Sequence, residues 1–221
     1  MKFFIKSSLA LALVLGWGIG LSWAGEFQGE VDYHVTMSDG HKSQMNYFLK
    51  GSKARMEMTM DGHHVVNIID FPAKKIYMLM PEQKIVMTTA IPDVKKEQSK
   101  TGEKMKKTGK TKKILGRETY EWKSTDKNGT TSIWGAKGMG AFMMGAGPGG
   151  KGPDTSWTAA VEKAGLFPLE MDSKEKKDGM SMIATKIESK HLDNSLFKVP
   201  SDYKDMSAMM QGMAAGAMPH F

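Results

Sequence analysis

Residues 54–60 read Ala-Arg-Met-Glu-Met-Thr-Met, an unbroken alternation of apolar and polar side chains. Successive side chains of a β-strand point to opposite faces of the sheet. The stretch therefore predicts a strand with Met56, Met58 and Met60 on one face and Arg55 and Glu57 on the other. β-branched residues are the usual choice for a buried strand face. Methionine is flexible and polarizable instead, so this face is expected to adapt its packing.

Strand patterns continue on both sides of this stretch. Turn signals such as Asp61-Gly62 separate short segments that alternate or run apolar, and no helical pattern lies between them. This spacing predicts an up-and-down antiparallel meander rather than a parallel sheet. The predicted strands are residues 27–37, 43–50, 54–60, 65–71, 76–80 and 85–89.

The second half of the chain predicts more strands and one helix. Strands are expected at 114–124 and 130–134, around an Asn-Gly turn, and again at 166–171 and 180–188. Residues 154–156 can cap a helix that Gly165 ends. Its apolar stripe is Trp157, Ala160, Val161 and Ala164, which would lie across a sheet. The fold class is therefore mainly β (α+β).

The ends of the chain differ from this domain. Lys2 and Lys6 precede an apolar run, and Ser22 and Ala24 supply the small residues of a cleavage site. Residues 1–24 are therefore predicted to be a signal peptide cleaved after Ala24, which places the protein in the periplasm or outside the cell. Residues 25–204 form one domain, and residues 205–221 form a methionine-rich tail. With no cysteine, disulfides and a lipidated cysteine are excluded.

Two segments inside the domain are predicted to be loops. Residues 92–113 are rich in lysine and almost free of apolar side chains, so they cannot bury a face. The lysines between Lys95 and Lys113 are candidates for contact with anionic lipid headgroups. Nucleic acid is not expected as a partner after export, since no aromatic residue interleaves the lysines. Residues 135–153 are rich in glycine and methionine and predict a mobile loop.

Several short motifs together resemble a family of bacterial secreted proteins related to the periplasmic lipoprotein-carrier superfamily, with LolA-like and LolB-like domains. The motifs are Phe27-x-Gly29, Lys50-Gly-Ser-Lys-x-Arg55, Ile114-x-Gly116, Trp134, Phe167-Pro-Leu169 and Ser195-Leu-Phe-x-Val-Pro200. The resemblance implies a curved antiparallel half-barrel closed by one or two helices around an apolar cavity that holds acyl chains. The chain lacks the cysteine that the family often carries in the later hairpin.

The function predicted from these observations is binding of a lipid or lipoprotein acyl chain, without catalysis. No nucleophile, phosphate-loop or metalloprotease motif is present, so no enzyme activity and no cofactor are expected. Unbranched thioether side chains can repack around acyl chains of different shape. The predicted ligand-binding residues are Tyr33, Met45, Tyr47, Met56, Met58 and Met60.

Two alternatives remain open from the sequence. Thioethers select Cu(I), so the tail is a candidate copper site. Its residues would be Met206, Met209, Met210, Met213, Met218 and His220. The second alternative is an envelope sensor that uses the lysine segment and the tail to contact a protein or membrane; no protein partner is identified.

Overall fold

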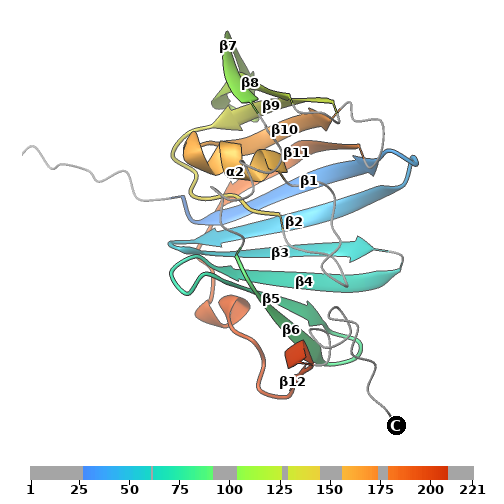
Figure 1. The fold of residues 1–221 in the computed structure, drawn as a ribbon. Helices are drawn as coiled ribbons and strands as arrows, with labels where there is room; N and C mark the ends of the chain where they lie inside the picture. Colours follow the sequence, from blue (N-terminus) through green and yellow to red (C-terminus); the bar gives the residue numbers. More distant parts are fainter. Residues whose placement is uncertain are drawn as a thin grey trace, which may run out of the picture.

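The computed structural model describes residues 27–60, 62–91, 104–125, 129–144, 156–173 and 179–208. Nearly all of its regular structure is a single 12-stranded sheet (Figure 1). The strands are β1 (Gly29–Met37), β2 (Lys42–Lys50), β3 (Lys53–Met60), β4 (His63–Asp70), β5 (Lys75–Met80), β6 (Ile85–Ala90), β7 (Lys104–Ile114), β8 (Arg117–Thr125), β9 (Thr130–Ala136), β10 (Phe167–Ser173), β11 (Met180–Ser189) and β12 (Lys204–Asp205).

Two antiparallel meanders make up the sheet. Strands β1 to β6 lie side by side in sequence order, and so do β7 to β11. The two meanders join where β1 pairs antiparallel with β11. The short β12 adds to the free side of β6 in parallel. The predicted mainly β, antiparallel meander is therefore confirmed.

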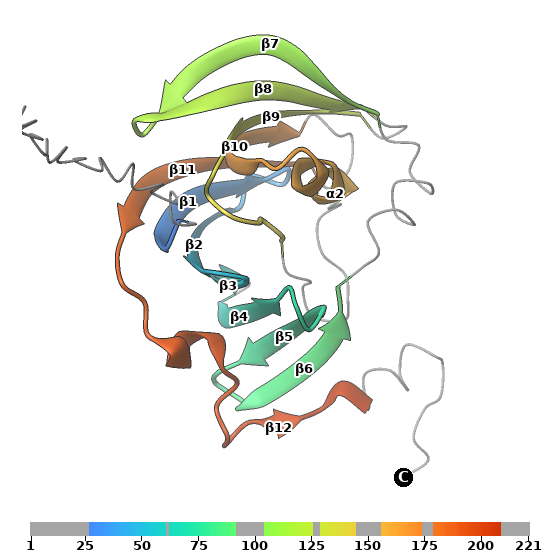
Figure 2. The same cartoon turned by 90° about the vertical axis from the view of Figure 1, so that its left-hand side faces the viewer.

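The sheet stays open, with β12 at one edge and β7 at the other. The one α-helix in the described residues, α2 (Ser156–Lys163), lies beside β10 and covers part of one face (Figure 2). A short 3-10 helix, η2 (Asn194–Phe197), lies beside β3. The sheet is therefore open. The described residues do not form the expected half-barrel closed by helices, because α2 is too short to span the sheet.

We call the face that carries Tyr33, Met45, Tyr47 and Met56 the inner face. These side chains are all buried in the main hydrophobic core. α2 packs on this face through Trp157 and Val161, two residues of the predicted apolar stripe. Gly165 follows the helix at φ +62°, and its N–H donates to the carbonyl of Glu162, as expected for a glycine that ends a helix.

The opposite, outer face has its own small core over strands β4 to β6. It consists of Val66, Ile68, Leu79 and Val86. Val199 and Tyr203 from the C-terminal segment pack against it, so residues 190–206 cover this part of the outer face. The segment is also held by Arg55, whose Nη1 donates to the carbonyl of Leu196 at 3.0 Å. Burial on both faces explains the nearly continuous apolar sequence of β4.

The prediction of a loop over residues 92–113 is wrong for its second half. Residues 104–114 form the edge strand β7, while residues 92–103 lie outside the described part. Met105 and Ile114 pack against the inner core at the two ends of β7, and the lysines between them are largely exposed. A row of lysines is a common way to keep an edge strand from pairing with another chain. The sequence pattern missed the strand because an edge strand needs few buried side chains.

Glu121 on β8 fixes an irregularity in β7. The pairing register of β7 with β8 shifts between Lys107 and Thr111. The hydroxyl of Thr108 in this bulge donates to Glu121 Oε2 at 2.7 Å. This hydrogen bond lowers the pKa of the Glu121 carboxyl, with further lowering by Ser132 and the nearby lysines against the opposing effect of burial. The carboxylate therefore stays charged while it holds the bulge.

The junction of the two meanders requires a glycine. A Cβ atom on Gly29 would lie 2.0 Å from the carbonyl oxygen of Glu188 and 2.9 Å from the ring of Phe27. Glu188 belongs to the junction, since it lies in β11 next to Ser189, the residue that pairs with Gly29. Any side chain at this position would push β1 and β11 apart.

We predict that Gly29→Ala lowers the free energy of unfolding by about 1–3 kcal/mol, because the added methyl group overlaps backbone atoms that cannot move aside. Urea unfolding followed by circular dichroism measures this loss. Gly51→Ala is the control, since a Cβ there has nothing within 4 Å and meets only the cost of its φ of +55°. Wild-type stability of Gly29→Ala would contradict the close approach.

Candidate binding site

The methionines of the strands lie on one face. Cross-strand pairing places Met45 opposite Met58, Met78 opposite Met87, Met171 opposite Met182 and Met37 opposite Met180. Because directly paired residues point to the same side, each pair shares a face. Every strand methionine whose side chain is described lies on the inner face: Met37, Met45, Met56, Met58, Met78, Met80, Met87, Met105, Met171, Met180 and Met182.

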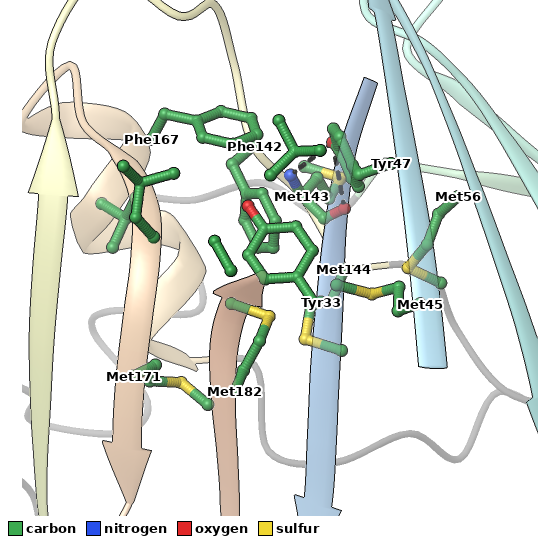
Figure 3. Close-up of a cluster of buried hydrophobic side chains, with 14 of the residues drawn as sticks. Tyr33, Met45, Tyr47, Met56, Phe142, Met143, Met144, Phe167, Met171 and Met182 are labelled. Atoms are coloured by element: carbon green, nitrogen blue, oxygen red, sulfur yellow. Dashed lines mark hydrogen bonds between the residues drawn. The ribbon is translucent and has the colours of Figure 1, made fainter. Parts of the chain in front are cut away.

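Aromatic rings form the centre of this face (Figure 3). Phe142 stacks on Tyr47 with ring centroids 4.9 Å apart and on Trp157 of α2 at 5.9 Å. Phe167 and Tyr33 meet the ring of Phe142 edge-on. Phe142 thus contacts rings from β1, β2, β10 and α2, which locks these elements together.

Two buried tyrosine hydroxyls stabilise the inner face, one by linking β1 to β10 and the other by linking β2 to the segment that covers the sheet. Tyr33 donates to the carbonyl of Pro168 at 2.8 Å. Tyr47 accepts from the backbone N–H of Met143 at 3.1 Å. Burial raises the pKa of both phenols, and the Met143 hydrogen bond only partly offsets this for Tyr47. Both hydroxyls are therefore neutral at physiological pH, and this part of the inner face carries no charge.

We call residues 138–144 the cover segment, because they lie over the inner face without forming a helix or strand. Met139, Phe142, Met143 and Met144 of this segment are all buried in the inner core. Its sequence predicts a mobile loop, but the structure buries its apolar side chains. The apolar residues that alternate with glycines in this segment could have indicated that it packs on the sheet. Residues 145–153 of the predicted loop lie outside the described part.

The structure brings five of the six predicted ligand-binding residues together. Tyr33, Met45, Tyr47, Met56 and Met58 are all less than a tenth exposed and belong to one cluster beneath α2 and the cover segment. The side chain of Met60 lies outside the described part of the structure. Sequence reasoning therefore found the face but missed the chain segment that covers it.

Asn67 is a polar exception on the inner face. It pairs with Met56 on one side and Met78 on the other, and its neighbours along β4 on the same face are Val65 and Ile69. The residue is 1% exposed, and its Oδ1 has no hydrogen-bond partner among the described residues. A buried acceptor without a partner costs about 1–3 kcal/mol. Nothing in the sheet itself explains why an amide occupies this position.

A second buried polar atom without a partner lies at the other end of the same face. Trp122 of β8 is paired with the core residue Ile133, and its Nε1 donates to no described atom. Lys107 lies opposite on β7. The inner face therefore offers an unused acceptor in β4 and an unused donor in β8.

The predicted copper ligands are largely beyond the described residues. Of that set only Met206 is described, and its backbone N–H donates to the carbonyl of Val86. In the described ranges, no three histidine or carboxylate side chains gather in a way that could hold a metal ion. Residues 1–24, predicted to be a signal peptide, likewise lie outside the described part of the chain.

A family model described as a domain of unknown function, DUF4412, matches residues 27–203. The chain belongs to the DUF4412 family. The match begins just before β1 and ends just before β12, so the DUF4412 domain contains both meanders, α2, the cover segment and most of the outer covering segment. A search of the curated proteins finds no match.

Solved structures resemble the DUF4412 domain at low sequence identity. PNGF-II is similar with a TM-score of 0.54 and 16% identity, over 86% of this chain and 33% of PNGF-II. An uncharacterized conserved protein from Thermus thermophilus has a TM-score of 0.48 and 9% identity, over 80% of this chain and 90% of that protein. LprF from Mycobacterium bovis has a TM-score of 0.32 and 8% identity, over 82% and 92%. The chain spans about a third of PNGF-II, and the likeness to PNGF-II shows a shared fold only.

We predict that Asn67→Leu raises the free energy of unfolding by about 1 kcal/mol, because it replaces an amide whose buried Oδ1 has no partner among the described residues by an apolar side chain of similar size. Asn46→Leu on the outer face of β2 is the matched control. Asn46 donates to Asp32 at 2.8 Å, so its loss should lower stability by about 1 kcal/mol. Urea unfolding of both variants measures the difference, and equal destabilisation would show that the Asn67 amide has a structural partner.

Proposed function

We propose that the DUF4412 domain is an exported, non-enzymatic binding protein whose inner face takes an apolar ligand, the acyl chain of a lipid or lipoprotein. The observation that carries the proposal is the different composition of the two faces of the same strands. The outer core over β4 to β6 uses valine, isoleucine and leucine, and none of its described residues is a methionine. The inner face of the same sheet collects the strand methionines.

The two compositions suit two kinds of packing. Branched side chains have few rotamers and suit a face whose neighbours never change. Methionine has three rotatable side-chain bonds and a polarizable sulfur, so it can pack against different shapes at little cost. A face that only had to close a permanent core would not need so many methionines among its branched side chains.

An acyl chain would enter by replacing the cover segment. Residues 138–144 follow a strand and hold the inner face through side chains and the Tyr47–Met143 hydrogen bonds, without a regular element of their own. Losing the burial of a large aromatic such as Phe142 costs about 3–5 kcal/mol. Each buried methylene of the ligand contributes about 0.8 kcal/mol, so a chain of about a dozen methylenes contributes about 10 kcal/mol, which offsets the loss of Phe142 and part of the burial of Met139, Met143 and Met144.

Contact with a membrane surface belongs to the same proposal. Lys106, Lys107, Lys110 and Lys113 of β7 are exposed, and each lysine near an anionic surface contributes about 1 kcal/mol. In the described residues no helix has the length and apolar character needed to cross a bilayer. Export rests on the signal-peptide pattern of residues 1–24. Salt-dependent sedimentation with vesicles of anionic lipid tests the contact.

We predict that full-length mature protein binds a fluorescent fatty acid, and that Met56→Leu/Met78→Leu weakens binding about tenfold or narrows the range of chain lengths bound. Leucine keeps the volume at a stability cost of less than about 1.5 kcal/mol, but it removes the flexibility. Displacement titrations with unlabelled fatty acids of different length measure the effect. Leu79→Met on the outer face is the control and should bind like wild type. Absence of binding by wild-type protein would exclude the proposal.

A further inference from the structure

The inner face contains one row in which an amide interrupts methionines. Cross-strand pairing aligns Met56, Asn67, Met78 and Met87 across β3, β4, β5 and β6. Along β4, Val65 and Ile69 lie on either side of Asn67 on the same face, and all three are buried. The amide is therefore surrounded by apolar side chains both along and across the strands.

The chemistry of this amide limits what can satisfy it. Its Oδ1 is a hydrogen-bond acceptor with no partner among the described residues, so a ligand that satisfies it must bring an O–H or N–H donor. No charged side chain belongs to the row or to its two neighbours on β4, so an ammonium group would be buried without a counter-charge. A carboxylate would place negative oxygen against the carbonyl oxygen. A neutral hydroxyl within an apolar chain meets both restrictions.

We infer that the inner face is selective for an acyl chain that carries a hydroxyl group, which donates to Asn67 Oδ1 while the methylenes on either side pack on Met56 and Met78. The inference rests on the proposed function and specifies its ligand class. A site that contains a buried acceptor discriminates strongly against an analogue without the donor, because the empty acceptor remains desolvated when the analogue binds.

The test uses the mature full-length protein and octadecanoic acids. One acid is unsubstituted, a series carries a single hydroxyl at different carbons, and a matched series carries a keto group, which only accepts hydrogen bonds. We expect at least one hydroxy acid to bind about tenfold more tightly than the unsubstituted acid, with no such gain for the keto acids. Isothermal titration calorimetry measures the dissociation constants.

The variants separate the amide from the rest of the face. Asn67→Leu should still bind the unsubstituted acid but lose the preference for the hydroxy acid. Asn46→Leu, on the outer face, should keep that preference. Equal affinity of wild type for hydroxy and unsubstituted acids, a preference for the keto acids, or a preference retained in Asn67→Leu would overturn the inference while leaving the proposed function intact. Failure of all the acids to bind would instead overturn the proposed function.

Discussion

The structure depends on one constraint: side chains alternate between the two faces along each β-strand, and the pairing of the strands keeps this alternation aligned across the whole sheet. Alternation within each strand would separate methionines from polar residues only locally. Pairing β1 with β11 joins the two meanders, so that methionines from residues 37 to 182 share one side. A bulge between Asp32 and Tyr33 in this pairing preserves the arrangement. Because of this bulge, Ile187 on one side of it and Met182 and Met180 on the other side all face the inner core. Ile183, next to Met182 in β11, is exposed on the opposite face.

A sheet with two apolar regions must cover both, and this chain uses different means for each. Residues 190–206 cover the outer core with hydrogen bonds to Arg55 and to β6 and with a short parallel strand. The inner face is covered by α2 and by the cover segment, which has no regular structure. The covering segment without regular structure therefore lies over the methionine-rich face. This correspondence is the physical basis of the proposed binding function.

Much of the fold follows from local sequence signals. The strands of the first meander and the helix stop at Gly165 were predictable because alternation, turn residues and capping act within a few neighbouring residues. β7 was missed because its lysines face solvent along an edge, where burial leaves no pattern. The burial of Phe142 was missed because it depends on rings from β2, β10 and α2, which are distant in sequence.

The candidate site shows the same division. The alternation of residues 54–60 identified Met56 and Met58 as inner-face residues. Asn67 was not identified, because in the sequence it is one polar residue in the apolar run of β4. Its meaning appears only when the pairing with Met56 and Met78 and the missing hydrogen-bond partner are known.

Methionine-methyl NMR can detect a ligand on the inner face directly, since the methyl groups line the proposed ligand surface. Mature protein labelled at the methionine methyl carbons would be titrated with a fatty acid, with assignments from single Met→Leu variants. We expect the signals of Met56, Met58 and Met78 to shift together with those of Met143 and Met144 as the ligand replaces the cover segment. A saturating ligand that leaves all of these signals unmoved in a folded protein would contradict it.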